Sequence, residues 1–264
     1  MRHTKHATQI LICSLIIAAG PLFGEVNMQV RNGRPIVDGV YVNGHGPYRF
    51  LLDTGANVNL IETAIAGKIG MNATFQVDLA SVASKTASQG SDGNQVVLDP
   101  VKAESQKFLF SPLEAIHDTS PDIQGVLGQW FLSQFDYTLD LRGQHLEFGR
   151  QHLDGTRAPF RMLNGRTSIS TNLGDLILDS GVARLVRFGV VSNRVDNAAY
   201  MRTIAGSQLV GMVFSRLSIQ GQDIWSGDVL TMPSRSEPGV DGLMPLSLFK
   251  AIYVCNSEGY VVFK

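Results

Sequence analysis

The sequence predicts a mostly-β protein built from two similar halves. Turn-forming residue pairs recur along the chain, and the runs between them are short and rich in Val, Ile, Leu, Phe and Tyr. Short strands with closely spaced turns are typical of all-β architectures. In addition, one short pattern occurs once in each half of the chain, and a repeat of this kind indicates a duplicated structural unit.

The expected strands lie between the turns. Asn-Gly pairs begin at positions 32, 43 and 164, and this dipeptide is a strong signal for a tight hairpin turn. The clearest strands are expected at residues 36–42, 48–52, 96–98 and 209–219. Two stretches of helical character interrupt them, at residues 61–69 and 128–135. A polar segment that contains Gly and Pro, residues 151–159, is the expected linker between the halves.

The repeated pattern is an apolar strand that ends in Asp, a small hydroxyl residue and Gly. The first copy is Asp53-Thr54-Gly55, and the second is Asp179-Ser180-Gly181. Two such loops that face each other would bring two carboxylates into contact. Because two carboxylates at close range cannot both ionise, they share a proton, and their pKa values move apart. One carboxyl group then serves as a general base and the other as a general acid.

The surroundings of the two motifs repeat as well. Gly125-Val126-Leu127-Gly128 follows the first motif, and Gly242-Leu243-Met244-Pro245 follows the second. A strand from Tyr137 to Asp140 is then expected to correspond to the run from Tyr253 to Asn256. In both halves a turn and a strand that ends in Phe come next. The sequence therefore predicts that both halves have the same order of elements.

With these motifs the chain resembles the pepsin/retropepsin clan of aspartic proteases, especially its bacterial retropepsin-like members, over residues 28–264. The Asp-Thr/Ser-Gly loops and Val126-Leu127-Gly128 match the clan's motifs, whereas Pro245 stands where the clan has Gly. The resemblance implies two pseudo-symmetric acid-protease-like lobes in a single chain, with an active cleft between them. It also implies a flap at the polar residues 83–94, for which an ordinary surface loop is the alternative. Residues 201–207 are the comparable stretch of the second half, as a second flap or a simple hairpin.

The resemblance also assigns roles to the motif residues. Asp53 and Asp179 would form a catalytic dyad that activates a water molecule for hydrolysis of peptide bonds in a peptide or protein substrate. Thr54, Gly55, Ser180 and Gly181 would support the active loops, with the two hydroxyl groups bonding across the interface between them. The alternative from another class is a catalytically inactive peptide-binding module on the same fold, since fold does not fix function. A single active half that dimerises is a third reading.

The composition narrows the class of function. The chain has 264 residues, of which 44% are hydrophobic, so it can form one large domain or two small lobes. Its net charge of −1 gives no electrostatic reason to expect a nucleic-acid partner. The six His are scattered, and no His/Cys cluster or HExxH motif indicates a metal site. We therefore expect neither metal nor cofactor, and a monomer with an internal pseudo-two-fold axis.

The N-terminus differs in character from the rest. A basic start precedes an uncharged apolar run and then small residues, which is the pattern of a secretory signal peptide. We expect residues 1–24 to be this signal, residues 25–150 the N-terminal lobe and residues 151–264 the C-terminal lobe. The protein would then be exported, periplasmic or secreted; the alternative is a membrane anchor formed by an uncleaved N-terminal segment. Signal removal would leave Cys255 as the one cysteine, expected to be buried on a strand.

Overall fold

The structure is a computed structural model that describes residues 24–80, 85–190, 199–203, 206–232 and 238–264. The expected signal peptide lies almost entirely outside the described residues. None of the helices within those ranges is long and apolar enough to cross a membrane.

The predicted mostly-β class is confirmed. The described residues form twenty strands, three short α-helices and one 3₁₀ helix, η2. The helices are α1 (Thr63–Lys68), α2 (Glu114–His117), α3 (Gln129–Leu132) and η2 (Leu246–Leu248). The strands of the first half are β1 (Gly24–Arg31), β2 (Arg34–Val42), β3 (His45–Leu52), β4 (Asn59–Glu62), β5 (Phe75–Ala80), β6 (Lys85–Leu98), β7 (Val101–Ser111), β8 (Gly125–Leu127), β9 (Tyr137–Asp140) and β10 (His145–Phe148). Those of the second half are β11 (Thr156–Leu163), β12 (Arg166–Thr171), β13 (Gly174–Asp179), β14 (Val186–Phe188), β15 (Ala199–Thr203), β16 (Gly206–Ile219), β17 (Gln222–Met232), β18 (Gly242–Pro245), β19 (Ala251–Cys255) and β20 (Tyr260–Phe263).

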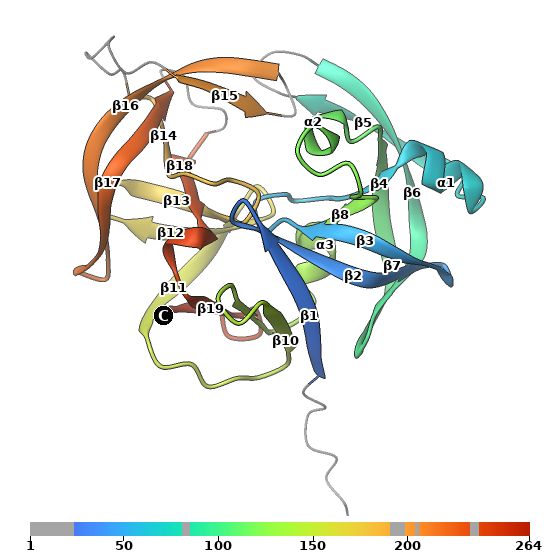
Figure 1. The fold of residues 1–264 in the computed structure, drawn as a ribbon, viewed down its shortest axis with the longest axis horizontal. Helices are drawn as coiled ribbons and strands as arrows, with labels where there is room; N and C mark the ends of the chain where they lie inside the picture. Colours follow the sequence, from blue (N-terminus) through green and yellow to red (C-terminus); the bar gives the residue numbers. More distant parts are fainter. Residues whose placement is uncertain (1–23, 81–84, 191–198, 204–205, 233–237) are drawn as a thin grey trace, which may run out of the picture.

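The strand pairings of the second half repeat those of the first. In the first half β3 pairs with β2 and, in parallel, with β8, while β4 pairs antiparallel with β8 and parallel with β7. In the second half β13 pairs in the same way with β12 and β18, and β14 pairs with β18 and β17. Figure 1 shows β2 to β8 on one side of the molecule and β12 to β18 on the other.

A third sheet contains strands from both halves. Its order is β1-β10-β9-β19-β20-β11, with every neighbouring pair antiparallel. The central contact is between β9 and β19, where Thr138 lies opposite Tyr253. Leu139, Ile252 and Val254 of these two strands are fully buried. Cys255 is also buried on β19, as the sequence predicts, and has no disulfide partner among the residues that the structure describes.

The turns lie where the Asn-Gly pairs predict them. Asn32 and Gly33 both have positive φ, of 52° and 79°, and the pairs that begin at 43 and 164 have closely similar values. Two successive positive φ values define the type I′ turn, whose twist suits a two-residue hairpin. Each of the three pairs joins two antiparallel strands, so this part of the prediction is confirmed.

Three expected element boundaries require correction. The helix expected at residues 61–69 begins later, at Thr63, because residues 59–62 pair with β7 and β8 as β4. The helix expected at 128–135 is the shorter α3. The linker is also shorter than expected, because Thr156 to Pro159 pair with β20 as the start of β11.

The polar stretch 83–94 is not a loop in its described part. Residues 85–94 belong to β6, which pairs with β5 and β7. Ser88, Ser91 and Asn94 are buried there. Ser88 Oγ donates to Phe110 O at 3.1 Å, and Asn94 Nδ2 donates to Ser91 O at 3.0 Å. Polar side chains can occupy a buried strand when their hydrogen bonds are made in this way.

Candidate active site

The two Asp-Thr/Ser-Gly loops start from strands that are held on both sides. Leu52, the last residue of β3, pairs with Leu127 of β8, and Leu178 of β13 pairs with Met244 of β18. All four side chains are fully buried. The loops therefore leave rigid, apolar supports, so the position of each Asp is fixed by the packing beneath it.

Four hydrogen bonds join the two loops. Thr54 Oγ1 donates to Leu178 O at 2.7 Å and accepts from the Ser180 backbone N–H at 3.0 Å. In the reverse direction, Ser180 Oγ donates to Leu52 O at 2.6 Å and accepts from the Thr54 backbone N–H at 2.9 Å. Thr54 and Ser180 are both completely buried. The expected bonding between the two hydroxyl residues is therefore present, and it fixes loops 126 residues apart in sequence.

The loops bring the two carboxyl groups together. Those of Asp53 and Asp179 lie within hydrogen-bonding reach of each other. A Cβ atom added at Gly55 would lie 2.2 Å from Asp179 Cγ, and one added at Gly181 would lie 2.7 Å from Asp53 Oδ2. Only glycine lets each loop approach the opposite carboxyl group this closely.

Backbone N–H groups hold each carboxyl group in its own loop. Asp53 Oδ1 accepts from the N–H groups of Gly55 and Ala56, at 3.0 and 3.2 Å. Asp179 Oδ1 accepts from the Gly181 N–H at 2.7 Å. These bonds favour the ionised forms, whereas burial opposes them.

Burial has the larger effect on both pKa values. It raises the pKa of Asp53 above its ordinary value. Burial, and then the neighbouring charge of Asp53, raise the pKa of Asp179 to about 8. A carboxyl pair with raised pKa values holds its proton to higher pH than isolated carboxyl groups do.

The sequence difference between Gly128 and Pro245 has a local explanation. The Gly128 N–H donates to the side-chain oxygen of Asn59 at 2.9 Å. Pro245 occupies the corresponding position, since Leu127 and Met244 pair with equivalent residues of β3 and β13. Proline has no N–H, and Leu185, the counterpart of Asn59, has no acceptor in its side chain. The second half thus lacks both partners of this bond, and its parallel pairing of β13 with β18 is retained.

Sequence reasoning missed three residues near the pair. Gln129 is buried, and its Nε2 donates to Thr54 O at 2.8 Å. The positive charges of Arg34 and Arg166 lower the pKa values of Asp53 and Asp179, respectively, and so offset part of the effect of burial. The arginines had a detectable signal, because each directly follows a repeated Asn-Gly pair. Gln129 had no such signal in the sequence, because a single polar residue after a glycine at the start of a short helix belongs to no recognisable motif.

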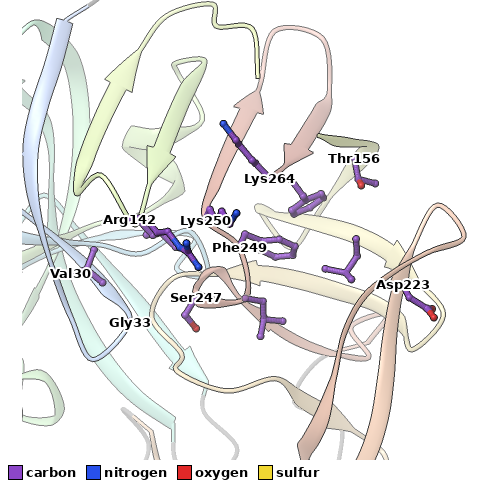
Figure 2. A pocket seen from close by; sticks show the side chains of 13 residues that line it. Val30, Gly33, Arg142, Thr156, Asp223, Ser247, Phe249, Lys250 and Lys264 are labelled. Carbon is purple, nitrogen blue, oxygen red and sulfur yellow. The ribbon is translucent and has the colours of Figure 1, made fainter. Parts of the chain in front are cut away.

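A separate cavity of about 540 Å³ lies beside the sheet shared by both halves. Figure 2 shows Arg142, Lys250, Phe249 and Lys264 among its lining residues. Neither Asp53 nor Asp179 lines it. This cavity is therefore separate from the site of the carboxyl pair.

Comparison with known proteins finds similarity over part of the chain. Residues 39–131 match a family model described as aspartyl protease. Among solved structures, a retropepsin-like aspartic protease from Rickettsia conorii is similar over 48% of this chain and 90% of its own, with 18% identity and a TM-score of 0.37. No curated protein matches the sequence.

The family match spans the first Asp-Thr-Gly motif and Gly128. This segment is therefore similar in sequence to aspartyl proteases, and the predicted resemblance to that class is confirmed. The match ends at residue 131, before the second motif. The second half resembles the first half of this chain in its strand pairings and in the loop that carries Asp179.

Proposed function

We propose that the chain is an aspartic endopeptidase that cleaves a peptide or protein substrate with the Asp53/Asp179 pair as its dyad. The observation that carries the proposal is the buried network between Thr54 and Ser180, which holds the two carboxyl groups against each other. An acid and a base in one rigid site are the groups that peptide hydrolysis needs when no metal supplies them.

In the proposed mechanism a water molecule lies between the two carboxyl groups. The ionised member takes a proton from this water as it attacks the peptide carbonyl carbon. The protonated member donates a hydrogen bond to the carbonyl oxygen, and a proton then passes to the leaving nitrogen. General acid–base help of this kind contributes on the order of 10²–10⁴-fold, and positioning and electrostatics supply the rest.

The proposed working range is mildly acidic to near-neutral pH. The raised pKa of Asp179 supports this, because the shared proton is kept well above strongly acidic pH. The clan's pepsin-like members often have a hydroxyl residue directly after the motif, but here Ala56 and Val182 occupy those positions. We expect a bell-shaped pH–rate profile whose two limbs belong to the coupled pair. Ala56→Ser should move its acidic limb downward.

The proposed architecture is two lobes with the active cleft between them, and the hairpins β5/β6 and β15/β16 as flaps. Figure 1 shows the two hairpins on the same side of the molecule, one from each half, which supports this assignment. The residues that connect the paired strands, 81–84 and 204–205, lie outside the described residues. Insertion of a bulky residue pair within either connection should change the Michaelis constant for a peptide more than the stability.

The deciding experiment is to incubate the purified mature chain with a mixed peptide library over a range of pH. Asp53→Asn and Asp179→Asn should each nearly abolish cleavage while the protein stays folded. Asp154→Asn is the matched control, since Asp154 has a side chain that is 92% exposed. Near-wild-type turnover in either dyad variant would exclude the mechanism. Binding of peptides without cleavage by the wild type, at every pH, would instead favour an inactive peptide-binding module.

We also propose export, on the strength of the basic and apolar N-terminal segment. A site that operates near neutral pH suits a compartment that is not acidified. N-terminal sequencing of the native protein should find a start shortly after residues 20–24. Retention of residues before Ile10 would favour the membrane-anchored alternative.

A further inference from the structure

The two active loops differ in the hydrogen bonds of one peptide group. In both loops the N–H of the motif glycine donates to the Asp two residues earlier. In the first loop, the carbonyl oxygen of the same peptide group, Thr54 O, also accepts from Gln129 Nε2 at 2.8 Å. The peptide group between Thr54 and Gly55 is therefore hydrogen-bonded at both ends.

A peptide group that accepts at its oxygen becomes a stronger donor at its N–H, because hydrogen bonds in a chain polarise one another. The side chain of Gln129 thus strengthens the bond from the Gly55 N–H to Asp53 Oδ1. That bond favours the ionised carboxylate. The backbone of Gln129 contributes to the same arrangement, since its N–H donates to Ala56 O at 2.9 Å.

The second loop has no equivalent donor from this position. The pairing of β13 with β18 makes Leu246 the counterpart of Gln129. Leu246 is completely buried, and its side chain has no N–H group. The difference between Gln129 and Leu246 therefore acts on one Asp of the pair and not on the other.

Gln129 is an unfavourable choice for stability alone. Its side-chain oxygen Oε1 is buried and has no hydrogen-bond partner. An unsatisfied buried polar atom destabilises a fold, and an apolar residue of similar size avoids this cost. Leu246 shows that the fold accepts an apolar residue at the counterpart position. A role in the site accounts for the amide better than packing does.

The charges around the pair do not produce the same asymmetry. Asp53 faces Asp179 from the other loop and Arg34 from β2. Asp179 faces Asp53 and Arg166 from β12. The arginines occupy equivalent positions after the two Asn-Gly turns, so each carboxyl group has one cationic neighbour and one acidic neighbour.

We propose that Gln129 is a positioning residue that makes Asp53 the ionised member of the pair and leaves the shared proton on Asp179. The inference rests on the proposed function, for which it assigns the base and the acid. Asp53 would then take the proton from water, and Asp179 would donate to the substrate carbonyl. The deeper burial of Asp179, which is 7% exposed, acts in the same direction.

The test measures which carboxyl group ionises first and does not depend on cleavage. The protein is labelled with ¹³C at the Asp carboxyl carbons, and the two signals are assigned with Asp53→Asn and Asp179→Asn. In the wild type, the Asp53 signal should move over the first step of the pH titration. A first step carried by Asp179 would overturn the proposal, whether or not the protein proves to be a peptidase.

Two variants test the role of Gln129 itself. Gln129→Met keeps the size and removes the donor, and should raise the pKa of the first step by about half a pH unit. The acidic limb of the pH–rate profile should move by the same amount, with kcat reduced more than KM changes. Gln134→Met is the matched control, because Gln134 donates to Trp130 O at an exposed position. A first step that is unchanged in Gln129→Met, or shifted equally in Gln134→Met, would refute the role.

Discussion

The hydroxyl of Thr54 should be a large single contributor to stability. Thr54→Val removes it with almost no change in volume, which leaves Leu178 O and the Ser180 N–H buried without this partner. Each unsatisfied group costs about 1–3 kcal/mol, so for the two groups we expect a loss of roughly 2–6 kcal/mol. For a chain of this size about 1 kcal/mol corresponds to roughly 2–4 °C, so Tm should fall by roughly 4–24 °C.

Thermal and urea unfolding, followed by fluorescence and circular dichroism, measure this loss. Thr54→Ser is the control, because it keeps the hydroxyl and removes one methyl group, for about 1 kcal/mol. The double variant with Ser180→Ala should lose less than the sum of the two single losses, since both side chains belong to one network. A Thr54→Val variant as stable as Thr54→Ser would show that the cross-loop bonds contribute little.

Three further predictions concern other parts of the molecule. Asp179 has a raised pKa, so its contribution to stability is complete below pH 3.8 and is lost as pH rises towards about 8. Asp179→Asn should therefore be more stable than the wild type at pH 7, by a few kcal/mol. Near pH 4 the two proteins should be equally stable in urea titrations. Gly128→Ala should destabilise the protein by about 3 kcal/mol or more, because the new Cβ would lie 2.1 Å from a backbone oxygen. In the control Gly67→Ala on α1, the new Cβ meets nothing within 4 Å, so this variant should be slightly more stable than the wild type. The two arginine partners of Asp122 lower its pKa to about 2. Asp122 therefore contributes stability above pH 3.8, and this stability is lost as pH falls towards 2. Asp122→Asn should cost about 1 kcal/mol of stability at pH 7, and less in high salt.

The active loops could be predicted from the sequence because their requirements are local. A strand that ends in Asp, a hydroxyl residue and Gly can be recognised within a few consecutive residues, and its second copy indicates the partner. The Asn-Gly turns are predictable for the same reason, since two positive φ values select these residues. Signals of this kind do not depend on distant parts of the chain.

The other features depend on the tertiary structure. Asn94 has the character of a loop residue in the sequence, and only the fold brings it to its partners, Asn43 in the turn between β2 and β3 and Gln106 on β7. Gln129 gains its role from a carbonyl 75 residues away. The alignment of Tyr137 with Tyr253 is wrong by one residue. Phe148 pairs with Tyr137 and Phe263 pairs with Ile252, so Ile252 is the true counterpart of Tyr137.

The shared sheet also makes the join between the halves depend on the last two strands. β20, residues 260–263, pairs with both β19 and β11, and β19 in turn pairs with β9 of the first half. A ribosome releases the chain from its N-terminus, so β19 and β20 emerge after both Asp motifs. We therefore expect the sheet that joins the halves to be completed late in folding, after the strands that carry Asp53 and Asp179 have been synthesised.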